Sequence, residues 1–106
     1  MQYTIGNTTG KYFTEWRFDI LRQVAEAISV LVQVESFHLF YVPEPVDYHC
    51  LQFEAGGHNF LIRFYKVLSC IIDGDEKSVW RIGRNYTIEM ARHVRNELSA
   101  KSHEPT

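Results

Sequence analysis

The sequence is poor in features that mark several special classes of protein. It has only 2 cysteines among 106 residues, which excludes a framework of several disulfides. No apolar run approaches the roughly 20 residues that a membrane-spanning helix needs. The N-terminal region has no basic segment followed by a hydrophobic one, so we expect no secretory signal. We therefore expect a cytoplasmic protein without a membrane segment.

A strong excess of charge of one sign is also missing. The formal net charge is −2, from 11 basic and 13 acidic residues. A protein attracted to nucleic acid by its overall charge is therefore not indicated. Aromatic residues, in contrast, make up 14% of the chain and hydrophobic residues 45%. That supply can fill one core without metal or disulfide, so we predict a single domain over residues 1–100 and a flexible tail over 101–106.

Residues 58–73 form the stretch that organises the predicted fold. Side chains on a strand point alternately to opposite faces. This stretch shows that period, because Phe60, Ile62 and Phe64 alternate with Leu61, Arg63 and Tyr65. Turn-forming residues border it on both sides. We predict one long central strand, with a bulge or bend near residues 66–69.

The other elements follow from hydrophobic period and from turn and capping residues. Apolar residues at helical spacing predict a helix that Thr14 caps and that ends near residue 33, and a final helix capped by Asn85 or Thr87. Further strands are predicted over residues 2–5, 36–42, 47–54 and 78–83. The fold class is therefore α+β: an antiparallel sheet of four to five strands, a long amphipathic helix on one face and a C-terminal helix, in the order β-α-β-β-β-β-α.

This order of elements resembles the helix-gripped sheets of cystatin-type and hotdog-type folds. The resemblance concerns the order alone, and a fold by itself assigns no function. If the first helix covers the face that bears Phe60, Ile62 and Phe64, the opposite face bears Leu61 and Tyr65. Such a face is too apolar to be left in water. Either the terminal helix covers it, or another molecule does.

Side chains that could carry chemistry are few. His49 and Cys50, with His58 and Cys70, are the only cluster of metal-binding types, but neighbours on a strand point to opposite faces. A surface histidine and a packed thiol explain the cluster better, so we expect no metal and no cofactor. Either cysteine could act as a nucleophile only if exposed beside a base such as His38.

Two further clusters have simple explanations. Asp73, Asp75 and Glu76 crowd one turn, where solvation explains them better than a bound cation does. Basic residues stand beside aromatic ones on two predicted strands, a pattern found in proteins that bind single-stranded nucleic acid. These residues are Arg63, Tyr65, Lys66, Arg81 and Arg84.

We therefore predict a small, non-enzymatic protein-binding module, such as an adaptor, an inhibitor, an immunity-type protein or a phage counter-defence protein. It would act through a sheet face on another protein, or associate with itself into a homo-oligomer such as a homodimer. The predicted contact residues are Phe40, Arg63, Tyr65 and Arg81. The alternative is a ligand-binding protein or enzyme with a pocket between helix and sheet, lined by His38, His49 or Tyr41. A single-stranded nucleic-acid binder is the second alternative.

Overall fold

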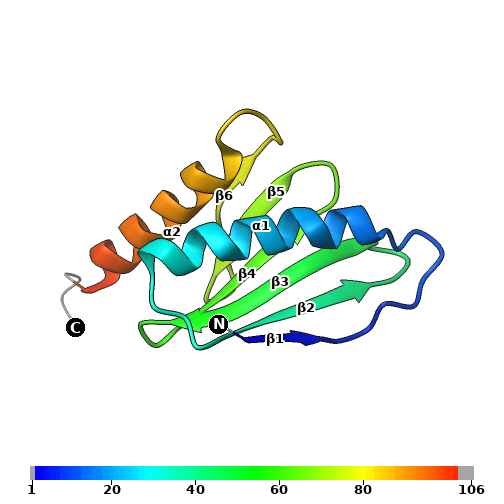
Figure 1. The fold of residues 1–106 in the computed structure, drawn as a ribbon, viewed down its shortest axis with the longest axis horizontal. Coiled ribbons are helices and arrows are strands. Elements are labelled where there is room, and N and C mark those ends of the chain that lie inside the picture. The colour runs from blue at the N-terminus through cyan, green and yellow to red at the C-terminus, as the bar shows by residue number, and fades with distance from the viewer. Residues whose placement is uncertain (1, 103–106) are drawn as a thin grey trace.

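The computed structural model describes residues 2–102, apart from the side chains of Lys77 and Ser102. Two helices and six strands follow one another along the chain (Figure 1). They are β1 (Gln2–Ile5), α1 (Glu15–Leu31), β2 (Ser36–Val42), β3 (Tyr48–Ala55), β4 (His58–Phe64), β5 (Leu68–Ile72), β6 (Asp75–Trp80) and α2 (Tyr86–Ser102). The predicted α+β class and the general order of elements are confirmed. The predicted tail begins inside α2, and residues 103–106 lie outside the described residues.

The strands form one sheet in the order of the sequence, from β1 at one edge to β6 at the other. Strands β2 to β6 pair antiparallel, whereas β1 pairs parallel to β2. The parallel pair arises because α1 carries the chain back to the start of the sheet before β2 begins. The sheet therefore has six strands in place of the predicted four to five, and it is mixed, though mostly antiparallel.

The predicted long strand over residues 58–73 is wrong in one respect, because it folds into the hairpin of β4 and β5. A turn over residues 65–67 joins them, and the N–H of Tyr65 donates to the carbonyl of Val67 at 3.3 Å. Phe64 and Leu68 therefore face each other across the two strands. The turn has three residues, so the period-two pattern stays in phase through it and imitates one strand. The expected interruption near residue 66 is present as a full reversal.

Both helices lie on the same face of the sheet (Figure 1). Helix α1 contributes five buried residues to the core: Phe18, Leu21, Val24, Ala25 and Ile28. Helix α2 buries Met90, Ala91 and Val94 beside them. Of the two alternatives for the second sheet face, coverage by the terminal helix is therefore excluded. The apolar side of α2 packs against α1, β5 and β6. At β6 the ring of His93 contacts the ring of Trp80, with 4.8 Å between the centroids.

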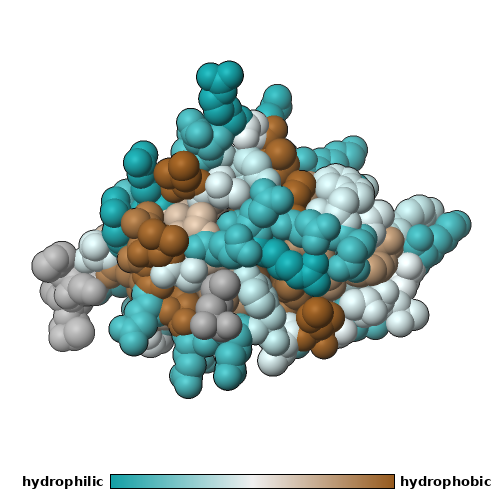
Figure 2. Space-filling view, in the orientation of Figure 1, coloured by the Kyte–Doolittle hydropathy of each residue, from teal (hydrophilic) through white to brown (hydrophobic). Residues whose placement is uncertain are grey.

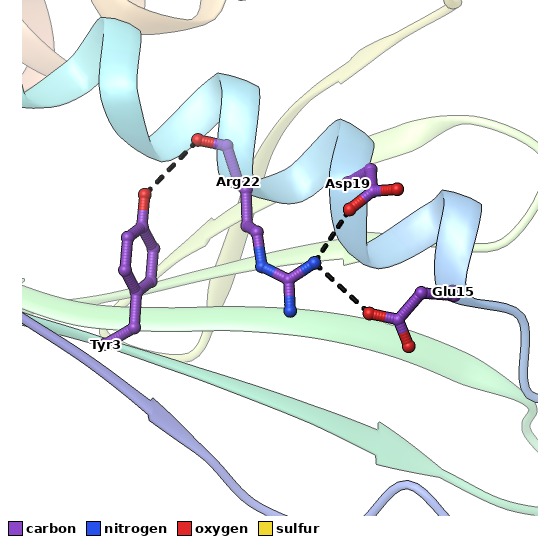
Figure 3. A network of polar contacts seen from close by, with 4 residues as sticks. All are labelled: Tyr3, Glu15, Asp19 and Arg22. Atoms are coloured by element: carbon purple, nitrogen blue, oxygen red, sulfur yellow. Dashed lines mark hydrogen bonds and ion pairs between the residues drawn. The ribbon is translucent and has the colours of Figure 1, made fainter.

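A polar network ties the edge strand β1 to helix α1 (Figure 3). The hydroxyl of Tyr3 donates to the carbonyl of Arg22 at 3.4 Å. The guanidinium of Arg22 also binds Asp19 at 2.7 Å and Glu15 at 3.2 Å. These pairs are partly exposed, so each adds little stability. They do fix the direction of Glu15, the acidic residue of the first turn of α1. Neither described helix is long and apolar enough to cross a membrane.

Candidate functional site

The sheet face opposite the helices is the first candidate site. We call it the uncovered face. Its residues follow from the strand register, which places every second side chain of each strand on it. Its apolar residues are Phe40 and Val42 of β2, Tyr48 and Cys50 of β3, Leu61 of β4, Ile71 of β5 and Val79 of β6. Its polar residues include His38, Gln52, Glu54, Asn59, Arg63, Ser69 and Glu76. Most of the apolar side chains are half-buried by their neighbours, and Val79 is 52% exposed.

Arg63 lies near the middle of the uncovered face. Its guanidinium lies over the ring of Tyr48, 4.5 Å from the centroid, and 3.6 Å from the carboxylate of Glu76. Cys50 lies beside it and is only 2% exposed, because neighbouring side chains close over the thiol. The middle of the face is therefore aromatic and aliphatic around Arg63, whose charge Glu76 opposes, and exposed polar side chains such as Gln52 and Glu54 lie beside it.

The four predicted contact residues do not all come together. Phe40 and Arg63 lie in one row across β2, β3 and β4, with Cys50 between them. Tyr65 follows β4 and packs edge-on against Tyr48 at 6.3 Å between centroids, at the end of the face. Arg81 comes after the last residue of β6, so it lies beyond the sheet. The sequence pattern missed Tyr48 and Ile71, whose place on this face depends on pairing with β4.

The side of the molecule that carries the helices has a different character. Its surface is mostly hydrophilic, and the hydrophobic residues on it form separate spots (Figure 2). Such spots are normal on a protein surface, whereas a continuous apolar area indicates contact with another molecule.

A second candidate site lies at the end of the sheet, next to the first turn of α1. We call it the His49 cavity, and it has a volume of about 530 Å³. Its wall includes Lys11, Phe13, Arg17, Asp47, His49 and Tyr65. These residues come from the segment before α1, from α1 itself, from β3 and its leading turn, and from the β4–β5 turn. The volume lies in the range usual for small-molecule sites.

His49 is the most unusual residue of this cavity, because it is a polar side chain that is only 1% exposed. Three aromatic rings surround its imidazole, with centroid distances of 4.7 Å to Tyr41, 5.5 Å to Phe13 and 5.7 Å to Phe18. Burial lowers the pKa of His49 from 6.5 to about 4, and the nearby charge of Arg17 acts in the same direction. The imidazole is therefore neutral at neutral pH.

Tyr41 supports this wall from the core. It is fully buried, and its hydroxyl donates to the carboxylate of Asp47 at 2.5 Å. Burial and this hydrogen bond to a carboxylate raise the pKa of Tyr41 to about 12, so it does not ionise near neutral pH. A wider and more open hollow of about 1000 Å³ lies at the other end of the sheet, where His38 and Phe53 are among its lining residues. His38 and His49 thus line separate hollows at opposite ends of the sheet, and Tyr41 is not among the lining residues of either.

The two cysteines do not form a reactive or bridged pair. Cys50 belongs to the uncovered face, whereas Cys70 pairs with Ile62 and faces the helices. Burial raises the pKa of each thiol to about 12, which keeps both protonated and unreactive. A nucleophilic role for either is therefore not supported.

The described residues contain no group of three side chains placed to hold a metal ion. His49 and Cys50 point to opposite faces, as the alternation predicts. Asp73, in the turn between β5 and β6, instead binds the start of β4, where it accepts from the N–H of Asn59 at 2.9 Å and pairs with His58 at 2.6 Å. These contacts hold the pKa of Asp73 below its usual value, and the backbone donor is the main cause.

One arrangement that the sequence analysis missed resembles a hydrolytic triad. Ser78, His93 and Glu97 are neighbours, with 3.0 Å from the serine hydroxyl to Nε2 of the histidine. The carboxylate of Glu97, however, lies 3.9 Å from the same Nε2. A triad needs the acid at one ring nitrogen and the serine at the other. The group therefore serves to attach α2 to β6, and the i,i+4 spacing of His93 and Glu97 was its only signal in the sequence.

Comparison of the chain with protein-family models, with curated proteins and with solved structures found no match.

Proposed function

We propose that this protein is a small, non-enzymatic protein-binding module and that the uncovered face is its docking surface. One observation carries the proposal: both helices pack on one face, and the other face keeps an aromatic and aliphatic surface around Arg63. Aromatic residues and arginine are the types enriched in protein interfaces. The occupant that fits best is a second copy of the chain.

The size of the face supports this occupant. Six strands about 4.8 Å apart, with about six residues in an average strand, give a face of roughly 25 by 20 Å. This corresponds to about 500 Å² in projection, and the accessible surface of the side chains is larger. Each partner of a standard interface buries about 800 Å². Face-to-face packing of two sheets would therefore use most of the surface.

The charges of the face also favour a second copy. Arg63 is opposed by Glu76 on the same face, so two copies would meet without a strong like-charge repulsion. A nucleic acid would instead require unpaired basic residues at the centre of its site. Pairing through the free edge of β6 is disfavoured, because Asp75 and Glu76 put charges on that edge strand.

The test measures the mass of the protein in solution by sedimentation velocity up to about 200 µM, with a variant of the face and a matched control. The face variant carries Leu61→Asp and Val79→Asp. The control carries Val30→Asp and Ile88→Asp, the same chemical change at exposed positions of the two helices. We expect the wild type and the control to be dimeric and the face variant to be monomeric. Circular dichroism checks that each variant folds. If the variant that carries Leu61→Asp does not fold, the single change Val79→Asp takes its place.

Two results would overturn the proposal. A monomeric wild type at the highest concentration removes the second copy as the occupant. A salt-dependent shift of short single-stranded DNA that the face variant loses would assign the face to nucleic acid and not to protein.

A further inference from the structure

The His49 cavity contains a hydrogen-bond donor that the protein itself does not satisfy. The backbone N–H of Thr14 donates to Nε2 of His49 at 3.0 Å, so Nε2 carries the lone pair. A neutral imidazole has one proton, which must then be on Nδ1. Nδ1 is buried and has no partner within residues 2–102. Buried polar groups are nearly always paired, so this donor requires an acceptor from elsewhere.

Two cations of the same cavity lack an acidic partner in the described part of the chain. Lys11 lies 5.4 Å from the centroid of the Tyr12 ring. Arg17 lies over the rings of Trp16 at 4.5 Å and Phe64 at 5.7 Å, and one of its Nη atoms donates to the hydroxyl of Thr14 at 2.9 Å. Its Nε is buried without a partner. Neither cation is within 4.0 Å of a carboxylate of those residues.

The acidic groups near the cavity are already engaged or directed elsewhere. Asp47 is the one carboxylate in the wall, and it accepts the hydroxyl proton of Tyr41. Glu15, in the first turn of α1, is directed towards Arg22 (Figure 3). No side chain caps the N-terminus of α1, because the Thr14 hydroxyl accepts from Arg17 instead. The wall therefore offers two cations and the positive end of a helix dipole against one carboxylate.

We propose that the His49 cavity binds a small organic anion with an aromatic or apolar body. An acidic oxygen of the ligand accepts the Nδ1–H of His49 and lies near Arg17 and Lys11. The body of the ligand packs against the rings of Phe13 and Tyr65 in the same wall. This activity is separate from docking at the uncovered face.

The test uses benzoate and phenyl phosphate as anionic probes and benzamidine as a probe with the same ring and the opposite charge. Titrations are followed by NMR of the backbone amides and of the imidazole nitrogens of His49. We expect both anions to shift the signals of His49 and of residues 11–17, and benzamidine to leave them unchanged. Comparison of the affinities for benzoate and for phenyl phosphate distinguishes a carboxylate site from a phosphate site.

Variants assign the binding to these residues. Arg17→Met keeps the apolar stem and removes the charge, and it should weaken benzoate about tenfold. Arg92→Met makes the same change at an exposed position of α2 and should leave the affinity unchanged. Lys11→Met, in the exposed segment before α1, provides the test if Arg17→Met does not fold.

Three outcomes would overturn the inference. One is the absence of any shift with either anion at millimolar concentration. Another is equal binding of benzamidine, which would make the cavity a non-selective apolar pocket. The third is a benzoate affinity that neither Arg17→Met nor Lys11→Met changes. A monomeric wild type in the sedimentation test would leave this inference standing, since His49, Arg17 and Lys11, which would bind the anion, do not belong to the uncovered face.

Discussion

The buried imidazole of His49 should make the protein unstable in acid, and the size of the effect follows from its pKa. The folded state holds this pKa at about 4, whereas the unfolded chain has the ordinary value of 6.5. Above pH 6.5 both states are neutral and the histidine has no effect. As the pH falls below 6.5, the unfolded state binds a proton that the folded state cannot, so stability is lost until about pH 4. The free energy of unfolding should drop by about 2 kcal/mol between pH 8 and pH 5 from this group alone.

The perturbation that isolates this effect is His49→Phe. Phenylalanine keeps the ring among Phe13, Phe18 and Tyr41 but cannot be protonated. The variant leaves the Thr14 N–H without its acceptor and also removes the unpaired Nδ1–H, so at pH 8 it should lie within about 2 kcal/mol of the wild type. At pH 5 its stability relative to the wild type should have risen by about 2 kcal/mol.

The assay is urea unfolding of both proteins from pH 8 to pH 5, read by tryptophan fluorescence. The control is His38→Phe, which removes an imidazole from the side of the sheet away from the helices and leaves His49 in place. It should keep the acid-dependent loss. Burial also lowers the pKa of His93, and that contribution is common to all three proteins and cancels in their differences. Parallel pH profiles for the wild type and His49→Phe would refute the reasoning.

Two further predictions concern packing. Gly10→Ala should destabilise the protein by about 1–3 kcal/mol in a urea titration, because the added Cβ would lie 2.2 Å from the ring of Tyr41, which is buried and held by Asp47. The control is Gly83→Ala, where an added Cβ meets nothing within 4 Å. Equal losses of stability in the two variants would contradict this account. Cys50 and Cys70 should react with a thiol reagent such as DTNB only as fast as the protein unfolds, because burial raises both thiol pKa values to about 12. Rapid labelling in native buffer would contradict this prediction, because it would show that one of the two thiols is accessible.

Local patterns in the sequence were sufficient for the two helices, for β2 and for the helix-facing side of the sheet. The predicted strand over residues 36–42 has the observed bounds, and the helix predicted after Thr14 begins at Glu15. Phe60, Ile62 and Phe64 point towards the helices, as the alternation predicts. These features depend on the spacing of apolar and polar side chains along one element, and that spacing can be seen directly in consecutive residues of the sequence.

Local patterns could not distinguish one long strand from a tight hairpin at residues 65–67. The turn contains neither glycine nor proline, and its three residues preserve the alternation on both sides. Only the pairing of Phe64 with Leu68 reveals the reversal. The same limit applies to Tyr48 and Ile71, whose place on the uncovered face follows from the register between strands.

The sequence by itself determined the α+β class, the sites of the two helices and the two-sided apolar character of the central strands. Only the tertiary structure decided that α2 packs beside α1, which leaves one sheet face uncovered, and that residues 11–17, 47–49 and 65 meet around one buried imidazole. The physical reason is that side-chain period is a property of neighbouring residues. The face that a helix covers depends on the competing apolar surfaces of the whole fold, and a cavity depends on which distant segments that packing brings together.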